Sequence, residues 1–181
     1  PYGDYVCQSD WSLGQVLKAL EDNGFRDNTL VIFSADNGPE TYAYPRIQKY
    51  GHRSMGPLRG LKRDIYEGGH RVPMLMRWPG VIPEGSVCEA LVGQVDLMAT
   101  IAAITGCSLP EDAAVDSLNL TPLLQGASPE PPIRSTHVHN TFEKHFAVRQ
   151  GDWVLIDAPS GSVSKVPEWF DKEYGYAPDP H

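Results

Sequence analysis

The chain has 181 residues, of which 41% are hydrophobic, and this is enough for one well-packed core and a small second lobe. Fifteen lysines and arginines against 23 aspartates and glutamates leave a net charge of −8, so no basic stripe is available to neutralise the phosphates of a nucleic acid. No long apolar run is present, so the sequence predicts no membrane span. A local cluster of cations can still bind an anionic substrate against the global sign of the charge.

The first predicted element is a helix over residues 10–23. Its apolar side chains recur at the spacing of one helix face, and Gly24 ends it. A continuous apolar run over residues 30–33, bounded by turn-forming residues, then predicts a buried strand. A helix followed by a strand is the unit of a mostly parallel sheet flanked by helices, so we expect an α/β fold.

Asp36 and Asn37 stand at the carboxyl end of this predicted strand. In an open α/β sheet, ligands bind outside the carboxyl ends of the strands. Carboxylate and amide oxygens are ligands that a hard cation such as calcium takes. The tripeptide Asp-Asn-Gly also makes ordinary turns, and on these residues alone the turn is the better interpretation.

The segment that follows combines glycines with charged residues. Residues 41–54 show no periodicity and carry several aromatic side chains, which is typical of a substrate-facing loop, although a self-packed surface loop is the alternative. Four glycines then alternate with cations and one acid: Gly56, Gly60, Gly68 and Gly69 among Arg59, Lys62, Arg63, Glu67, His70 and Arg71. This composition predicts a loop held close to an anionic ligand.

The later elements are weaker in pattern. Residues 71–78 alternate into a second short strand, and residues 95–105 predict a helix that Gly106 ends. Asp96, at the start of this helix, is explained by the preference of a carboxylate for the positive end of the helix dipole.

Prolines become frequent after Pro110 and indicate a connecting segment. Residues 146–149 and 153–156 flank Gln-Gly-Asp and predict a β-hairpin. The tail, which contains Pro167, Pro178 and Pro180, is expected to lack regular structure while its aromatic side chains cover the larger lobe.

Four motifs follow one another along the chain: Ser-Ala-Asp-Asn-Gly-Pro, Gly-Pro-Leu-Arg-Gly-Leu-Lys, Tyr-Glu-Gly-Gly-His-Arg-Val-Pro and Arg-Trp-Pro-Gly. In type and spacing they resemble the C-terminal half of a type I (arylsulfatase-like) sulfatase of the alkaline-phosphatase superfamily. The resemblance covers residues 4–126 well and the remainder loosely. It implies an alkaline-phosphatase-like catalytic domain whose C-terminal part is residues 1–126. Residues 127–181 would then form a small C-terminal antiparallel β lobe with the hairpin and the irregular tail.

The resemblance also implies a site. Asp36 and Asn37 would be two of the ligands of a calcium cofactor, and Lys62 would contact the sulfate group. The nucleophile of such enzymes is a formylglycine made from Cys or Ser in the motif Cys/Ser-x-Pro-x-Arg, and no cysteine or serine of this chain fits that motif. We therefore expect the nucleophile and a further pair of metal-binding aspartates to come from an N-terminal half of the same enzyme.

The histidines and cysteines carry weaker signals. His52 and His70 lie beside glycines and are candidates for substrate contact. His137 and His139 share a face of a strand, but no third ligand follows in a recognisable spacing, so a surface or substrate-rim position is the better interpretation. Three widely separated cysteines predict buried or incidental thiols and neither a zinc site nor a disulfide framework: Cys7, Cys88 and Cys107.

Three functions remain open at this point. The first is a sulfatase acting on a sulfated small molecule or sulfated glycan, which by resemblance would be exported (periplasmic or extracellular) or lysosomal. The second is a phosphate- or phosphonate-ester hydrolase of the same superfamily, which is disfavoured because Asp36 is followed by Asn and not by His. The third is a non-catalytic calcium-binding fragment.

Overall fold

The computed structural model describes residues 2–141 and 144–174. The chain opens with helix α1, Tyr2–Asp22, and a short 3-10 helix, η1, Arg26–Asn28. The predicted first helix is confirmed, but it begins at Tyr2 and not at residue 10, because its first turn contains no proline and holds Asp4 at the positive end of the dipole. Within the described residues, none of the helices combines the length and apolarity needed to cross a lipid bilayer.

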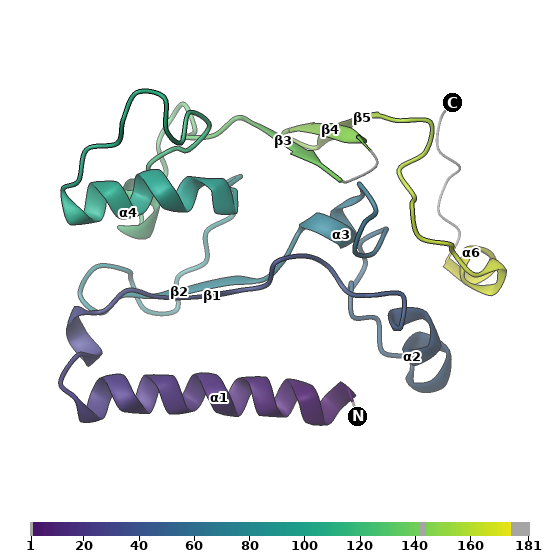
Figure 1. Cartoon of the computed structure of the whole chain (residues 1–181), viewed down its shortest axis with the longest axis horizontal. Helices are drawn as coiled ribbons and strands as arrows, with labels where there is room; N and C mark the ends of the chain where they lie inside the picture. Colours follow the sequence, from purple (N-terminus) through teal and green to yellow (C-terminus); the bar gives the residue numbers. More distant parts are fainter. Residues whose placement is uncertain (1, 142–143, 175–181) are drawn as a thin grey trace.

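Strand β1, Val31–Ser34, pairs with β2, Met74–Arg77, so both predicted strands are confirmed. The expected burial of the first strand was wrong, because none of its residues is fully buried and Phe33 is 40% exposed. The pair is antiparallel, with Val31 opposite Arg77 and Ser34 opposite Met74. An antiparallel pair is a common part of larger, otherwise parallel α/β sheets. Figure 1 shows α1 running beneath this pair.

Residues 41–54, expected to be an aperiodic loop, contain helix α2, Ala43–Tyr50. The expectation was wrong because a two-turn helix is too short for its periodicity to stand out in the sequence. Ala43, Tyr44 and Ile47 are its buried residues, and Gly51 ends it in the left-handed conformation. The three buried residues of α2 belong to a cluster that also includes Met55, Leu61 and Phe170.

Helix α3, Glu67–His70, precedes β2 in the connection between the two strands of the first sheet. Three elements then lead from β2 to the second sheet: η2, Gln94–Asp96, α4, Leu97–Thr105, and α5, Thr121–Leu124. The predicted helix is confirmed as α4, and Gly106 ends it with φ 69°. Asp96 stands at the start of α4, as expected. Its side chain is also fully buried and pairs with Arg134, so the helix dipole alone does not account for it.

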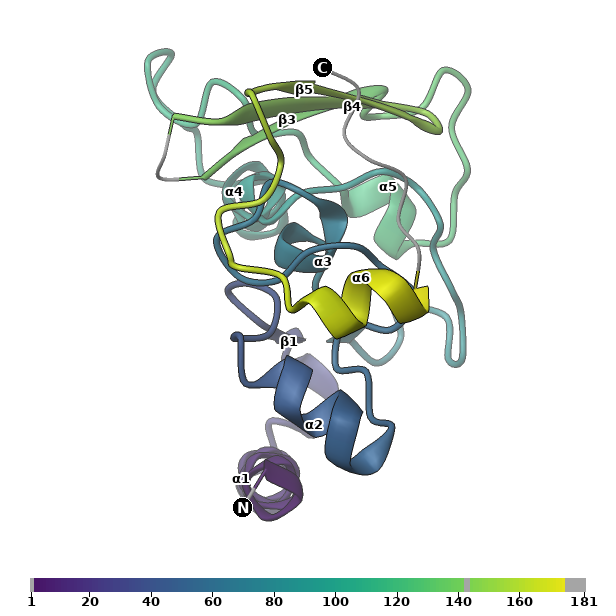
Figure 2. The same cartoon turned by 90° about the vertical axis from the view of Figure 1, so that its right-hand side faces the viewer.

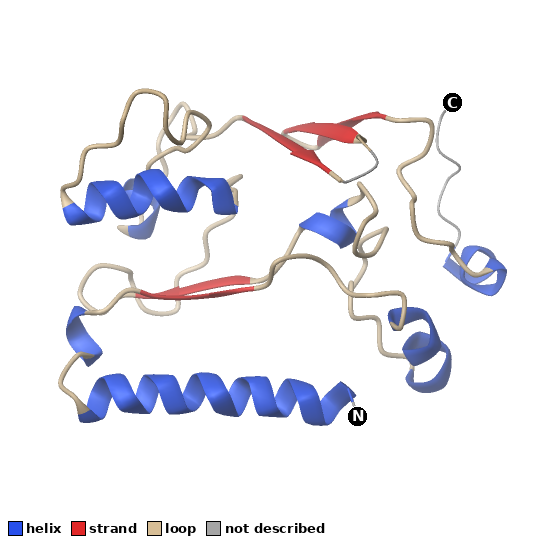
Figure 3. Ribbon diagram, in the orientation of Figure 1, coloured by secondary structure: helices blue, strands red, loops and turns tan. Residues whose placement is uncertain are grey.

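A second sheet is formed by β3, Thr136–Asn140, β4, Phe146–Gln150, and β5, Trp153–Asp157. The strands are antiparallel in the order β3-β4-β5, so the predicted hairpin is confirmed and gains a third strand. Figures 1 and 2 show α3 between this sheet and the level of β1 and β2, and Figure 3 shows the two sheets as separate layers. In Figure 1, α2 lies below the level of β1 and β2 at the lower right, while α3, α4 and β3–β5 lie above it.

The tail is more ordered than the sequence predicted, because α6, Glu168–Tyr174, follows Pro167. Phe170 is 3% exposed and packs edge-on against Tyr44 of α2, so burial of one aromatic ring stabilises a helix that has little sequence signal of its own. Pro178 and Pro180 lie outside the described residues. The three cysteines are free and exposed, so of the two expected alternatives, buried or incidental thiols, the structure excludes burial and leaves the incidental one.

Candidate functional site

The candidate cation ligands follow β1 directly. Asp36 is exposed and Asn37 is partly buried. The Asn37 side-chain N–H donates to the carbonyl of Gly38 at 2.9 Å, and this bond orients the amide while its oxygen can still accept a cation. The two side chains supply one carboxylate and one amide oxygen, a donor chemistry that fits calcium.

Glycines bring this turn against the next motif. The Gly38 N–H donates to the carbonyl of Gly69 at 2.9 Å, and the Gly68 N–H donates to the carbonyl of Arg59 at 2.7 Å. A Cβ on Gly38 would lie 1.8 Å from the Gly68 oxygen, and one on Gly68 would lie 2.1 Å from the Gly60 oxygen. The glycine pattern therefore serves the close approach of three backbone segments to one another.

Lys62 is held at the same place. Its N–H donates to the carbonyl of Pro39 at 2.9 Å, which joins the Asp-Asn-Gly-Pro turn to the Lys62 loop, defined here as residues 61–65. The Lys62 Nζ lies 3.5 Å from Glu40 Oε1, and about a third of the side chain (36%) is exposed. The backbone of Lys62 is therefore fixed beside the turn, while its ammonium lies near Glu40 and can be reached from solvent.

Glu40 is a site residue that sequence reasoning missed. It accepts two hydrogen bonds from the guanidinium of Arg63, at 2.8 and 2.7 Å. The Arg63 side chain lowers the pKa of the Glu40 carboxyl to about 2, and Lys62 acts in the same direction. The acid directly after Asn-Gly-Pro and the paired cations of Lys-Arg were the only signals of this arrangement in the sequence.

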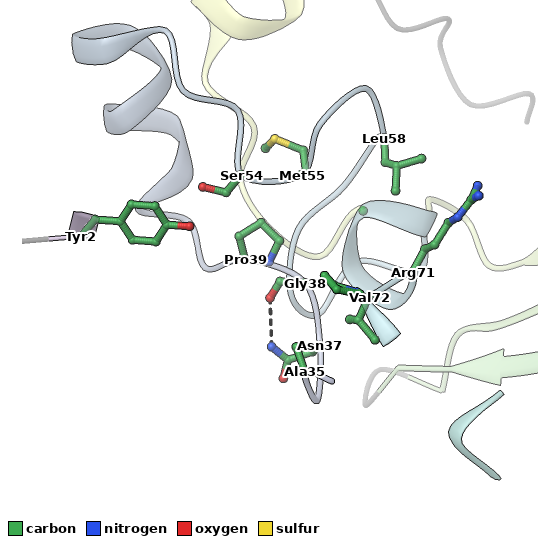
Figure 4. Close-up of a pocket in the computed structure, with 12 residues that line it drawn as sticks. Tyr2, Ala35, Asn37, Gly38, Pro39, Ser54, Met55, Leu58, Arg71 and Val72 are labelled. Carbon is green, nitrogen blue, oxygen red and sulfur yellow. Dashed lines mark hydrogen bonds between the residues drawn. The ribbon is translucent and has the colours of Figure 1, made fainter. Parts of the chain in front are cut away.

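A cavity of about 230 Å³ adjoins the turn. Asn37, Gly38 and Arg71 line it together with Tyr2 and Met55, among others. Figure 4 shows Asn37 and Gly38 on one side of the cavity and Ser54 and Met55 across it. The carboxyl end of β1 is thus hollowed, as expected for a ligand site in an α/β sheet.

The two histidines predicted to contact substrate, His52 and His70, lie in different environments. His52 is exposed, and its ring lies 5.5 Å from that of Tyr2. His70 faces the second sheet, with its ring 4.5 Å from that of His139. Burial lowers the pKa of His70 to about 4, and the neighbouring His139 adds to this shift. The structure does not bring His52 and His70 together.

His137 and His139 stack with their ring centroids 6.1 Å apart. Burial also lowers the pKa of His137. Within residues 2–141 and 144–174, no group of three or more His, Cys, Asp or Glu side chains is arranged to hold a metal ion. A calcium site that included Asp36 and Asn37 would need further oxygen ligands, since calcium takes about 6–8.

Comparison with protein families gives the context for this site. The model described as "Sulfatase" matches residues 1–107. The chain belongs to the sulfatase family. A second model, "N-sulphoglucosamine sulphohydrolase, C-terminal", matches residues 61–171, so recognition of this chain as a C-terminal portion of a sulfatase is confirmed.

Curated sulfatases align along most of the chain. An N-acetylgalactosamine-6-O-sulfatase from Bacteroides thetaiotaomicron is 34% identical over 179 residues, covering 96% of this chain and 34% of the relative. Human arylsulfatase A is 42% identical over 167 residues, covering 90% of this chain and 31% of the relative. The sulfatase chain described here thus spans about a third of the length of these relatives.

Solved structures agree with the fold. One from Bacteroides thetaiotaomicron, reported with the metabolism of multiple glycosaminoglycans, has a TM-score of 0.75 at 35% identity and covers 87% of this chain and 34% of that one. Another, solved with its substrate D-glucosamine-2-N,6-O-disulfate, has a TM-score of 0.66 at 25% identity and covers 83% of this chain and 29% of that one. These sulfatase neighbours confirm the expected alkaline-phosphatase-like α/β fold class.

Proposed function

We propose that this chain is the C-terminal portion of a calcium-dependent sulfatase that hydrolyses sulfate esters. Asp36 and Asn37 are two of its calcium ligands, and Lys62 contacts the sulfate group. The formylglycine nucleophile and the remaining calcium ligands belong to an N-terminal half outside this chain. Family membership supports the reaction class, and the chemistry of the donors supports the cation.

One observation supports the site above all others: the bond from the Lys62 N–H to the Pro39 carbonyl, 2.9 Å long. It joins Lys62, whose ammonium can bind an anionic group, to the turn that carries two oxygen ligands. A sulfate ester needs the metal ligands and the ammonium close together, because the metal ion and the ammonium then act on the same sulfate oxygens.

In this proposal the side chains of the chain bind and orient the sulfate. The Lys62 ammonium neutralises sulfate oxygens and then the negative charge that develops on the leaving ester oxygen. Glu40, paired with Arg63, restricts where that ammonium can lie. Bound calcium would supply Lewis-acid polarisation of the sulfate oxygens.

The substrate class is a sulfated small molecule or a sulfated glycan. Support comes from the relative described as an N-acetylgalactosamine-6-O-sulfatase and from the neighbouring structure solved with a glucosamine disulfate. His52 and His70 remain candidates for substrate contact. Of the two, exposed His52 is the better placed, because the ring of His70 is directed toward His139.

The test is Lys62→Ala in the complete enzyme, assayed with an aryl sulfate. Loss of one such donor lowers kcat/KM by about 10²–10³, and the stability should change by no more than about 0.5 kcal/mol because the side chain is partly exposed. Lys62→Arg should restore only part of the activity, because the planar guanidinium of arginine does not occupy the position of the compact lysine ammonium. Lys18→Ala, which removes an exposed lysine from α1, is the matched control and should keep wild-type activity.

The same assay separates the alternatives. Preference for an aryl phosphate over the aryl sulfate would replace the proposal by a phosphate-ester hydrolase. Absence of turnover with either ester, together with calcium binding that Asp36→Ala abolishes, would favour a non-catalytic calcium-binding protein. Unchanged activity of Lys62→Ala would remove Lys62 from the site.

A further inference from the structure

The Lys62 loop encloses a buried carboxylate, Asp64, whose side chain is 0% exposed. Its Oδ2 accepts the N–H of Leu61 at 2.8 Å. Its Oδ1 accepts the N–H groups of Val163 and Ser164 at 2.8 and 2.7 Å. One carboxylate therefore ties the loop that carries Lys62 to a segment that lies 100 residues further along the chain.

The same C-terminal segment also bonds the loop through its backbone. The Ile65 N–H donates to the carbonyl of Gly161 at 2.9 Å, and the Ser164 hydroxyl donates to the carbonyl of Lys62 at 3.2 Å. A Cβ on Gly161 would lie 2.4 Å from the ring of Tyr66, so a glycine is needed for this approach.

The second sheet holds the loop from another direction. The Thr141 hydroxyl donates to the carbonyl of Arg63 at 2.7 Å. His139, on β3, places Nε2 3.0 Å from the carbonyl of Ile65. With the Ser164 bond, the carbonyls of Lys62, Arg63 and Ile65 all have partners from residues 139–164.

The loop needs such support because its backbone is strained. Arg63, directly after Lys62, has φ 80°, in the left-handed region that a residue with a side chain adopts only at a cost. Local sequence preference would relax this conformation. The bonds from residues 139–164 hold it, and they thereby determine where the Cα of Lys62 lies.

We infer that Asp64 is a positioning residue for Lys62, acting through the C-terminal clamp, defined as residues 139–141 and 161–164. This inference rests on the proposed contact between Lys62 and sulfate. The ammonium is a point charge on a flexible stem, so its effect on the sulfate depends on where its backbone is held. A displacement of about 1 Å at such a group can cost about 10²-fold in rate.

The experiment uses Asp64→Asn in the complete enzyme, in the wild-type and in the Lys62→Ala background. The asparagine keeps the oxygen that faces Val163 and Ser164, but it directs an N–H group at the N–H of Leu61. We expect kcat/KM for an aryl sulfate to fall about 10- to 100-fold in the wild-type background and by less than about threefold when Lys62 is already absent.

Inhibition by inorganic sulfate supplies the readout that a purely structural role would not move. A smaller folded fraction lowers apparent kcat but leaves the inhibition constant for sulfate unchanged. A displaced Lys62 raises that constant, and we expect Asp64→Asn to raise it several-fold. An unchanged inhibition constant, or equal losses of kcat/KM in both backgrounds, would overturn the inference.

Thr141→Val keeps the test decisive if Asp64→Asn does not fold, since it removes one hydroxyl with little change of shape. It should lower kcat/KM and raise the sulfate inhibition constant in the same Lys62-dependent way. Thr105→Val, which removes a hydroxyl bonded to a backbone carbonyl on α4, is the control and should leave both values unchanged.

If Lys62→Ala itself leaves kcat/KM unchanged, the proposed function fails first and the inference falls with it. If Lys62→Ala is impaired while Asp64→Asn and Thr141→Val are both normal, only the inference is overturned.

Discussion

Asp96 and Arg134 form a buried ion pair, with side-chain exposures of 0% and 10%. The Asp96 carboxylate also accepts the N–H groups of Gly93 and Leu118 at 2.8 and 3.0 Å. Burial alone would raise the pKa of Asp96, but the Arg134 guanidinium and the two backbone donors outweigh it, so the pKa is lowered. The pair joins the start of α4 to the segment that leads into β3.

Arg134→Leu should destabilise the complete enzyme by about 3–5 kcal/mol, because it leaves a buried carboxylate without its cation. Chemical denaturation monitored by fluorescence measures the change. Lys172→Leu, which breaks an exposed pair with Glu168 on α6, is the matched control and should cost no more than about 0.5 kcal/mol. A loss below about 1 kcal/mol for Arg134→Leu would show that the pair is not needed.

At the scale of elements, the contact between the Asp36–Asn37 turn and α3 depends on glycine. Gly38→Ala would place a methyl group where Gly68 carbonyl oxygen lies, so the turn must shift. We expect a loss of about 1–3 kcal/mol in stability and weaker calcium binding, measured by denaturation and calorimetry. Gly14→Ala is the control: its Cβ meets nothing within 4 Å, and as a change inside helix α1 it should stabilise by up to about 1 kcal/mol. Unchanged calcium affinity in Gly38→Ala would separate this contact from the site.

The contact between α3 and β3 should make stability depend on pH. Burial, followed by the charges of His139 and His137, lowers the pKa of His70 to about 4, while a backbone hydrogen bond and the charge of Asp64 oppose this shift. The ordinary value is about 6.5, so between these two values the unfolded chain binds the proton more readily. Stability is therefore fully present above about pH 6.5 and decreases as the pH falls toward 4.

His70→Gln should flatten this dependence, because glutamine carries no titrating proton. Since His70 is only partly buried, we expect the wild type to lose about 1–2 kcal/mol more than the variant between pH 7 and pH 4.5. Thermal unfolding at several pH values is the measurement. Parallel pH profiles for the wild type and His70→Gln would exclude His70 as the source.

At the scale of the whole molecule, several large apolar side chains remain exposed on the layer formed by α1, β1 and β2. Trp11, Phe33 and Leu75 are 64%, 40% and 60% exposed. Side chains of this size are normally covered by another element, and the N-terminal half that we propose would supply one.

We expect the chain of 181 residues alone to show no turnover of an aryl sulfate, because no residue in it fits the nucleophile motif. It should also bind calcium much more weakly than the complete enzyme, since calcium takes about 6–8 oxygens and Asp36 and Asn37 supply few of them. In the complete enzyme, Asp36→Ala should weaken calcium binding severely by calorimetry. Turnover by the isolated chain above that of its Asp36→Ala, Lys62→Ala double variant would contradict this.

Sequence reasoning alone determined the elements and motifs whose signals are local. The apolar run of β1, the glycine that ends α4 and the turn between β4 and β5 all act within a few residues, so each could be read directly from the chain. The spacing of the four sulfatase motifs identified the family in the same way, and it pointed to Lys62 and to the Asp36–Asn37 turn.

Only the tertiary structure decided which groups share an environment. Asp64 meets two of its donors 99 and 100 residues away, Asp96 meets Arg134 38 residues away, and His70 faces His139 on another element. Helix α6 is stabilised by the burial of Phe170 against α2, and the helix propensity of its own sequence did not predict it. The physical reason is common to these cases: a buried charge or ring is stabilised by whatever partner the fold brings to it, and separation along the chain does not constrain that partner.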